Sequence, residues 1–350
     1  MASNLFLRNA WYVACWDEEV EAGALLARTI LNEPVVLFRA EDGRVAALLD
    51  RCAHRFAPMH MGKLLPGDRI QCPYHGLEFD GSGACVHNPH GNGNIPSRAR
   101  IRKFPTVTRH NAVWIWMGEN EPDYDAVPDF SVLDGVPETF ETKRDRIKIK
   151  ANYELIVDNL LDLSHVPYLH AGLLGNKDTI NPEITVEQDG EDVVVGRIAK
   201  NATPPGVFAT LMPDMPERVD QFSIIRWTAA SNLRLYTGVC KPGEQPEQGT
   251  GFHAIHLLTP ETERTTHYFF TAARFNVMTS DDDKNMEIRE TIARMRRYAF
   301  EEQDAPMIEA QQRVIDAATS ELDPVILSVD VGPMRYRRIM QKKIDAEGRI

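Results

Sequence analysis

Short runs of alternating apolar and polar residues fill the first third of the chain. They predict strands in PVVLFRA from Pro34, RVAALLDR from Arg44, RIQCPY from Arg69, GLEFD from Gly76 and AVWIWMG from Ala112. Such runs, rich in β-branched and aromatic residues and separated by turn residues, are typical of a small all-β unit. The stretch from about Glu119 to Pro137 is rich in Pro, Asp and Glu without a clear period, so we expect a domain boundary there.

The remainder of the chain mixes helical and strand patterns. A helix is expected in NYELIVDNLLDLSHV from Asn152, and a long amphipathic stretch runs from about Asp281 to Thr319. Between them lie five strand patterns: DVVVGRIA, QFSIIRWTA, LRLYTGV, FHAIHLLTP and THYFFTAARF. A sheet flanked by a few helices is an α+β arrangement and not a βαβ alternation. The sequence therefore predicts an all-β domain over residues 1–120 and an α+β domain over residues 121–350.

Composition and charge exclude several classes of function. The chain is 43% hydrophobic and 26% charged, as in an ordinary globular protein. Its 51 acidic and 39 basic residues give a net charge of -12, which disfavours nucleic acid and anionic membranes as partners. No apolar stretch approaches the roughly 20 residues that span a bilayer, and the N-terminal residues lack the pattern of a signal peptide. We therefore expect a cytoplasmic protein with no nucleic-acid or membrane partner.

The cysteines and histidines point to a metal centre in the all-β domain. Five cysteines without a signal peptide favour metal ligation over disulfides. Cys52 and His54 are followed, after seventeen residues, by Cys72 and His75. A zinc site would use the same residue types. Each half, however, supplies one thiolate and one imidazole and is not followed by a helix, which favours a two-iron cluster. The other three cysteines are expected to be buried or half-buried thiols: Cys15, Cys85 and Cys240.

The two segments resemble a known family. CAHRFAPMHMG and CPYHGLEFDGSG look like the two Rieske signatures of ring-hydroxylating and demethylating oxygenases. The resemblance implies a Rieske 2Fe-2S cluster with Cys52 and Cys72 on one iron and His54 and His75 on the other. It also implies the oxygenase (alpha) subunit, with an N-terminal Rieske domain and a catalytic domain of helix-grip type. GLEFDG, DNLLDLSH and IHLLTPET resemble the branch that includes vanillate O-demethylase and dicamba monooxygenase.

Two histidines near the predicted helix at Asn152 suggest a second metal. Asp162 and His165 are three residues apart, so on a helix they share a face. Pro167 should end or kink that helix and allow His170 to turn toward His165. A non-haem ferrous site that activates oxygen needs two imidazoles, one carboxylate and open positions. The alternative is that one histidine caps the helix and the other lies on the surface.

The segment AFEEQDAPMIEAQQRVI contains a candidate carboxylate for such a site. Helical spacing there places four residues on one stripe: Phe300, Asp304, Ile308 and Ile315. A carboxylate in an apolar row is costly to bury unless it is paired or metal-bound, so Asp304 is the candidate. Glu301, at the edge of the stripe, is the second choice. Alternatively, Pro306 breaks the helix and Asp304 only caps the next segment.

The same resemblance assigns roles to these residues. DNLLDLSHVPYLH and FEEQDAPMIEAQQ look like the family's iron-binding segments, which matches His165, His170 and Asp304 to the ligands of a mononuclear Fe(II). Asn159 matches a polar position near that iron.

Asp162 matches the family's aspartate that links a cluster histidine to an iron histidine across a subunit boundary. In this chain these would be His75 of one copy and His165 of its neighbour. The resemblance therefore implies a ring-shaped homo-oligomer, which we expect to be a homotrimer.

The function implied by the resemblance is that of a terminal oxygenase component. With O2 and reductase-supplied electrons it would oxidise a small aromatic substrate, by O-demethylation of a methoxylated aromatic acid such as vanillate. Gly81-Ser82-Gly83 lacks the third glycine and helix of a dinucleotide fingerprint. We therefore expect an external NAD(P)H-dependent reductase, with or without a ferredoxin domain. His256 matches a substrate-contacting position in the dicamba enzyme, and His253 and Arg226 are further candidates for the pocket.

Alternative functions remain open at this point. The same iron could support ring hydroxylation, N-demethylation or methyl hydroxylation. A 2Fe-2S electron carrier without a catalytic iron and a zinc-stabilised binding protein are more distant alternatives. Iron analysis separates them, because three irons per chain fit an oxygenase and two fit a carrier.

Overall fold

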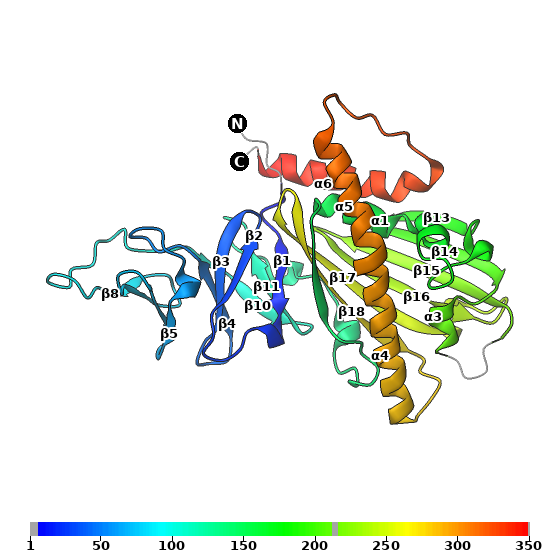
Figure 1. Ribbon diagram of the computed structural model, residues 1–350, viewed down its shortest axis with the longest axis horizontal. Coiled ribbons are helices and arrows are strands. Elements are labelled where there is room, and N and C mark those ends of the chain that lie inside the picture. Colours follow the sequence, from blue (N-terminus) through cyan, green and yellow to red (C-terminus); the bar gives the residue numbers. More distant parts are fainter. Residues whose placement is uncertain (1–5, 212–215, 349–350) are drawn as a thin grey trace. The chain divides into compact units, whose positions relative to one another are not determined.

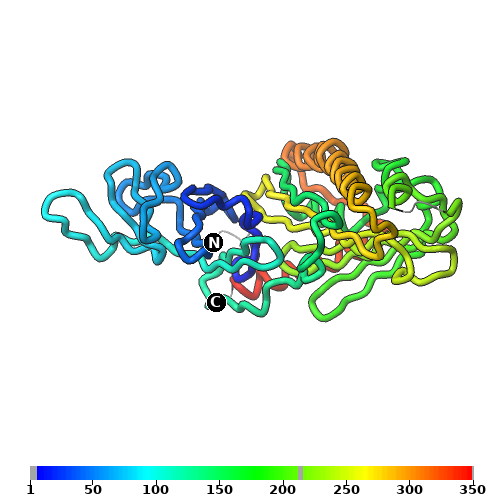
Figure 2. The backbone as a smooth tube through the Cα atoms, turned by 90° about the horizontal axis from the view of Figure 1, so that it is seen from below, coloured from blue at the N-terminus to red at the C-terminus, as the bar shows by residue number. Residues whose placement is uncertain are grey.

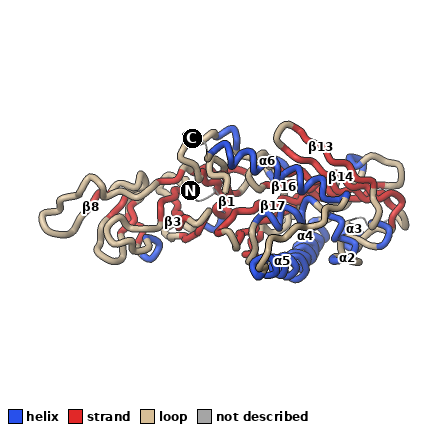
Figure 3. The backbone as a smooth tube through the Cα atoms, turned by 90° about the horizontal axis from the view of Figure 1, so that it is seen from above, coloured by secondary structure: helices blue, strands red, loops and turns tan. Residues whose placement is uncertain are grey.

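The computed structural model of the chain describes residues 6–211 and 216–348. The chain separates into two compact units. One comprises residues 6–127 with the short segment Thr259–Glu263, and the other comprises the remaining described residues from Pro128 onward. The helices, drawn blue in Figure 3, belong mainly to the second unit. No helix within the described ranges is long and apolar enough to cross a bilayer.

The first unit is built from three small antiparallel sheets. The first sheet contains β1 (Trp11–Trp16), β11 (Ala112–Trp116) and β10 (Thr106–Arg109), in that order. The second contains β2 (Leu26–Ile30), β3 (Glu33–Arg39), β4 (Val45–Leu49) and β9 (Lys103–Phe104). The third contains β5 (Lys63–Leu65), β6 (Arg69–Gln71), β7 (Glu78–Phe79) and β8 (Cys85–His87). The predicted all-β character of this part of the chain is confirmed.

Two-residue turns set the register of two of these hairpins. Leu31 and Asn32 join β2 to β3, and His110 and Asn111 join β10 to β11; all four have positive φ. Positive φ at both central positions is what the tight hairpin turns require, and Asn tolerates it well. Register in these hairpins therefore follows from local turn chemistry.

A seven-stranded sheet dominates the second unit (Figure 1). Its order is β12-β18-β17-β16-β15-β14-β13, so six strands follow one another as a meander and β12 lies at the edge beside β18. The strands are β12 (Asp145–Ile149), β13 (Glu183–Asp189), β14 (Asp192–Ala202), β15 (Val219–Thr228), β16 (Asn232–Cys240), β17 (Thr250–Thr262) and β18 (Thr265–Phe275). The expected α+β catalytic fold with an antiparallel sheet is confirmed.

One face of this sheet carries the long helices. The helices are α1 (Tyr153–Leu161), α2 (Val166–Leu169), α3 (Gly206–Ala209), α4 (Asp282–Tyr298), α5 (Ala305–Ala317) and α6 (Val331–Glu347). A π-helical segment, Ala299–Asp304, connects α4 to α5, and the three form one rod, orange in Figure 2, that crosses the strands. Trp227 of β15 points to the same face and packs against Tyr336 of α6, with ring centroids 5.4 Å apart. The sheet face that bears these helices is therefore the core of the unit.

Several details differ from the expectations. The long amphipathic stretch is helical as predicted, and Phe300, Asp304 and Ile308 are buried on it. The prediction that Ile315 lies on the buried stripe was wrong, because Ile315, near the end of α5, is 43% exposed. Helices α3 and α6 and strands β1, β2, β5, β8, β9, β10, β12 and β13 were not predicted from the sequence. The three remaining cysteines, Cys15, Cys85 and Cys240, are buried free thiols as expected.

The packing of Trp227 gives a test of this core. Trp227→Ala removes a fully buried ring between the sheet and α6, so it should lower the free energy of unfolding by about 3–5 kcal/mol. Tyr298→Ala is the control, since that aromatic residue is exposed and should change stability by less than about 0.5 kcal/mol. Denaturant unfolding followed by far-UV circular dichroism measures both; equal effects would contradict the assigned core.

Candidate metal centres and cavity

Helix α1 ends immediately before the first histidine-bearing turn. Its last residue is Leu161, and Asp162 caps the turn that follows by accepting hydrogen bonds from Ser164 N (2.9 Å) and Ser164 Oγ (2.8 Å). The expectation that Asp162 and His165 share a helical face was wrong, because the helix has already ended at Asp162. The side chain of Asp162 is occupied with the turn, and its backbone carbonyl contacts His165.

Pro167 acts differently from the expectation as well. It lies in the first turn of α2, where the missing N–H costs nothing, so it helps to begin this short helix. His170 follows directly as its C-terminal cap. The turn and α2 together bring the His165 and His170 rings to a centroid distance of 5.2 Å.

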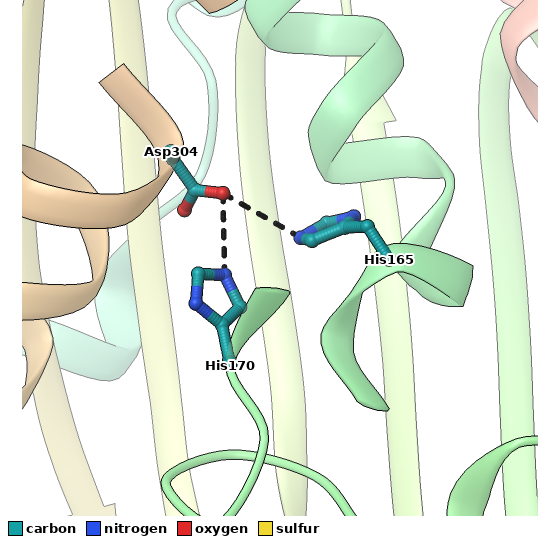
Figure 4. Close-up of side chains that lie close together, drawn as sticks. All are labelled: His165, His170 and Asp304. Atoms are coloured by element: carbon teal, nitrogen blue, oxygen red, sulfur yellow. Dashed lines mark ion pairs between the residues drawn. The ribbon is translucent and has the colours of Figure 1, made fainter. Parts of the chain in front are cut away.

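Asp304 completes a three-residue group with these histidines (Figure 4). His170 Nε2 lies 3.2 Å and His165 Nε2 lies 3.6 Å from Asp304 Oδ1. Asp304 is buried at the end of the π-helical segment, a type of irregularity that often occurs at functional sites. Among the described residues, this is the one group of three or more His, Cys, Asp or Glu residues whose ligand atoms all lie within 4.8 Å of one another.

Hydrogen bonds fix the tautomer of both histidines. His165 Nδ1 lies 2.8 Å from the Asp162 carbonyl oxygen, and His170 Nδ1 lies 2.8 Å from Gln303 Oε1. The Gln303 amide is itself oriented, because its Nε2 donates to the Leu169 carbonyl (2.8 Å). Both partners of the rings are acceptors, so each Nδ1 must donate and each Nε2 keeps its lone pair. The two Nε2 atoms and the Asp304 carboxylate therefore fit a ferrous ion.

Electrostatics also suit a cation at this place. Burial lowers the pKa of His165, so its ring is neutral at pH 7. For His170, burial acts in the same direction, but the hydrogen bond and charge of Asp304 outweigh it and raise the pKa. A metal ion would take the place of the second proton, which His170 carries on Nε2 toward Asp304 only when its ring is charged, so metal and protons compete for the site.

The neighbours of the triad show what the sequence found and what it missed. Asn159, expected near the iron, donates from Nδ2 to Asp304 Oδ1 (3.2 Å). Glu301, the second choice for the carboxylate, instead pairs with Arg297 at the surface (2.7 Å). Gln303 was not identified. Its position next to Asp304 was the available signal, but only the structure shows that its side chain reaches His170.

The two loops of the all-β unit form a second candidate centre with repeated backbone geometry. Each cysteine N–H donates to the carbonyl five residues later, at 2.9 Å for Cys52 and 2.8 Å for Cys72. Each cysteine carbonyl accepts from the N–H four residues later, at 3.0 Å in both loops. Those later residues, Phe56 and Gly76, both have positive φ. The loops therefore present two equivalent cysteines from one repeated turn.

The cysteines and histidines of these loops differ in burial. Cys52 and Cys72 belong to the apolar core of this unit, and burial raises the pKa of the Cys52 thiol to about 11. A positive metal is what would keep such a thiol ionised. His54 is exposed and His75 half-buried, with ring centroids 4.5 Å apart. In the described residues these donors are not gathered as tightly as the triad, which suits a two-iron cluster better than one zinc ion.

A largely apolar cavity of about 120 Å³ adjoins the triad, and His165, His170 and Asp304 form part of its wall. Its size is close to that of a cavity of about 150 Å³ known to hold benzene, so one aromatic ring is a suitable occupant. Strand alternation decides which side chains face it: His256 of β17 lines the cavity, whereas His253 and Arg226 point to the other face of the sheet. Arg226 pairs there with Asp192 and Asp189.

Comparisons with known proteins agree with both centres. Residues 10–105 match the family model of the Rieske [2Fe-2S] domain, and residues 149–346 match that of the vanillate O-demethylase oxygenase C-terminal domain. The oxygenase component of dicamba O-demethylase from Stenotrophomonas maltophilia is 39% identical over 96% of this chain and 97% of its own length. The oxygenase component of chloroacetanilide N-alkylformylase from Rhizorhabdus wittichii is 36% identical over 99% and 97%.

Solved structures agree as well. The crystal structure of dicamba monooxygenase bound to 3,6-dichlorosalicylic acid superposes with a TM-score of 0.87 at 36% identity, covering 98% of this chain and 99% of that one. The form with non-haem iron and dicamba gives 0.81 at 35% identity, with the same coverage.

The hydrogen bond from His170 to Gln303 leads to a prediction for metal binding. Gln303→Leu removes the acceptor that fixes the His170 tautomer, so ferrous iron should bind the triad about 10- to 100-fold more weakly. Glu302→Gln, at the exposed neighbouring position, is the control and should bind iron normally. Iron titration of the metal-depleted protein measures both variants; normal affinity in Gln303→Leu would show that His170 is oriented in another way.

Proposed function

The chain belongs to the Rieske non-haem iron oxygenases, in the branch of the dicamba and vanillate O-demethylases, and we propose that it O-demethylates a methoxylated aromatic acid such as vanillate. It is the oxygenase component, with a Rieske 2Fe-2S cluster. The observation that carries the proposal is the opening of the His165–His170–Asp304 triad into a cavity sized for one aromatic ring.

We assign the residues as follows. Residues 1–120 form the Rieske domain, in which Cys52, Cys72, His54 and His75 hold the cluster. Residues 121–350 form the catalytic domain, in which His165, His170 and Asp304 hold a mononuclear Fe(II). Iron bound there supplies the activation of dioxygen that the reaction requires.

The overall reaction balances with two electrons from outside. An aryl methyl ether, O2, two electrons and two protons give the hydroxymethyl ether and water, and the hydroxymethyl ether collapses to a phenol and formaldehyde. The chain's own residues orient and shield the reactants: the apolar cavity wall excludes water from the ring, and His256 contacts the substrate. Asn159 holds the Asp304 carboxylate in place through its hydrogen bond.

Electrons come from a partner, since an oxygenase component works with a reductase or ferredoxin. We propose an NAD(P)H-dependent reductase and a homotrimer in which Asp162 links His75 of the partner subunit to His165. The carboxylate of Asp162 is 23% exposed; it accepts hydrogen bonds from Ser164 and lies 4.0 Å from Arg197 Nη1, so lone pairs remain for an imidazole of the partner subunit. His165 already contacts the backbone of the same residue (2.8 Å), which would make the connection short.

N-dealkylation is the second candidate, and one observation favours it. A relative that covers nearly the whole chain is named as an N-alkylformylase, and the same cavity could hold an N-alkyl group at the triad. Formaldehyde and the dealkylated aromatic product distinguish the two reactions.

The central test is oxygen uptake and formaldehyde release with a panel of methoxybenzoates and a surrogate reductase. The wild-type protein should couple both to substrate. His170→Ala should abolish turnover and lower the iron content from three to two per chain, while the visible spectrum of the cluster stays unchanged. His87→Ala, which alters an exposed histidine, is the control. Full activity in His170→Ala would refute the assigned iron site.

The bridging role of Asp162 has its own test. Asp162→Asn keeps the shape of the side chain but removes its charge, so electron delivery should slow about 10- to 100-fold with both metal centres loaded. Stopped-flow reoxidation of the reduced cluster in a single turnover measures this step. Asp189→Asn, an exposed aspartate of β13, serves as control. Single-turnover rates equal to wild type would argue against the bridge.

A further inference from the structure

An arginine is buried in the wall of the cavity without a close counter-charge. Arg296 of α4 is 7% exposed and lines the cavity that holds the triad. Its Nη2 donates to the Lys143 carbonyl (3.1 Å), but Nε and Nη1 are buried and have no hydrogen-bond partner. Arginine carries five N–H donors and remains charged in proteins, so this is an unusually poor set of partners.

The surroundings of Arg296 do not neutralise it. Burial lowers its pKa to about 10, so it stays charged at neutral pH, although Asp145 and Glu141 act in the opposite direction. Among the described residues no carboxylate forms an ion pair with it. Asp145 is paired with Arg297 (3.0 Å) and Glu141 with Arg144 (2.9 Å). The guanidinium instead lies 5.0 Å from the centroid of the Phe270 ring.

A second unpartnered group lies beside it in the same wall. His256 is 2% exposed; its Nδ1 lies 2.7 Å from Tyr268 Oη, and its Nε2 is buried without a partner. Burial and then the charge of Arg296 lower the pKa of His256 to about 3, so the ring is neutral. When the Tyr268 hydroxyl donates to Nδ1, the ring proton is on Nε2 and is available to an acceptor.

We propose that Arg296, with His256 beside it, binds an anionic substituent of the aromatic substrate, a carboxylate or a sulfonate. The inference rests on the proposed function, since it takes this cavity as the substrate site, and it names the group that recognises the substrate's charge. An anion satisfies the donors of Arg296 and supplies its missing counter-charge. Because Nε and Nη1 are shielded in the ligand-free protein, the proposal requires the guanidinium to turn from the Phe270 ring toward the cavity when an anion binds.

The position on the helix fits such a role. Ile292, Arg296, Phe300 and Asp304 follow one another at four-residue steps and all line the cavity. Arg296 and Asp304 are eight residues apart, which is at most about 12 Å along the rod, because six of those residues are π-helical and rise less than the α-helical value of about 1.5 Å each. A substrate can therefore place its anion at Arg296 and its alkyl group at the triad.

The other arginine of the cavity is less suited. Arg197 of β14 already has a carboxylate nearby, with its Nη1 4.0 Å from Asp162 Oδ1. Of the two arginines that line the cavity, Arg296 is therefore the one that lacks a carboxylate partner and can bind an added anion.

Calorimetric titration of the iron-loaded holoenzyme with benzoate and its neutral isostere benzamide tests the proposal. Neither compound can be demethylated. Wild type should bind benzoate more tightly than benzamide, and Arg296→Gln should weaken benzoate about 10- to 100-fold while benzamide changes little. Arg297→Gln, the adjacent exposed arginine, is the matched control and should keep the preference. Benzenesulfonate, as a third ligand, shows whether the site takes a sulfonate as well as a carboxylate.

Thermal unfolding gives a second readout. Arg296→Met replaces an uncompensated buried charge by an apolar chain of similar length, so it should raise the Tm of the ligand-free protein. Benzoate should raise the Tm of wild type and leave that of Arg296→Met unchanged. Arg296→Lys, which keeps the charge, should retain part of the preference for benzoate. Cluster absorbance checks that each variant is folded, and wild type and Arg296→Lys decide the question if the others do not fold.

Two outcomes would overturn the proposal: equal affinity of wild type for benzoate and benzamide, or a preference that survives Arg296→Gln and is lost in Arg197→Gln. Failure of the proposed function looks different. Equal formaldehyde release from 4-methoxybenzoate and its methyl ester would keep O-demethylation and refute the anion site. Benzoate binding that depends on Arg296, without formaldehyde from any methoxybenzoate, would support the anion site and refute O-demethylation.

Discussion

The arrangement of the catalytic domain depends on one buried carboxylate. Asp304 Oδ1 is approached by His170 Nε2 at 3.2 Å, by Asn159 Nδ2 at 3.2 Å and by His165 Nε2 at 3.6 Å. An ionised carboxylate away from water costs several kcal/mol unless such partners compensate it. The partners come from α1 and from the turn and short helix after it, while Asp304 comes from the rod of α4 and α5. These elements must therefore meet for the carboxylate to be buried at all.

The π-helical segment explains how the rod keeps one face toward the cavity. Four-residue steps overshoot a turn of an α-helix, which has about 3.6 residues per turn, so a stripe at such spacing drifts around the helix. The segment Ala299–Asp304 winds more slowly, because its hydrogen bonds span five residues, and it turns the stripe back. Ile292, Arg296, Asp304 and Ile308 consequently all stay buried.

These features show how far the sequence could lead. The candidate ligands near the N-terminus lie in two short segments whose spacing indicated a metal centre, and Asp304 stood out as a carboxylate within an apolar row. Spacing alone left the roles of His165 and His170 open, and the family resemblance assigned them. Ile315 failed because periodicity does not show where a helix passes beyond the elements it packs against. Strand alternation alone did not rank His253 and His256, since it gives two faces without showing which one is covered; the preference for His256 came from the family resemblance. Gln303 and Arg296 act through partners more than a hundred residues away, which local pattern cannot reveal.

The same rod places two opposite charges, Arg296 and Asp304, in the wall of one cavity. The distance between them determines whether each requires a counter-charge from elsewhere. Among the described residues they form no ion pair with each other, and two charges about 10 Å apart, at an effective dielectric constant of about 20, attract by roughly 1.7 kcal/mol, against about 4 kcal/mol for a pair in contact. Arg296 and Asp304 therefore cannot compensate each other. Asp304, which faces the Nε2 atoms of two imidazoles, would be completed by a cation, and Arg296 on our proposal is completed by an anion. A substrate with a negative group at one end and an alkyl group at the other fits this cavity. Its negative group supplies the anion that Arg296 lacks, while its alkyl group reaches the metal site at Asp304.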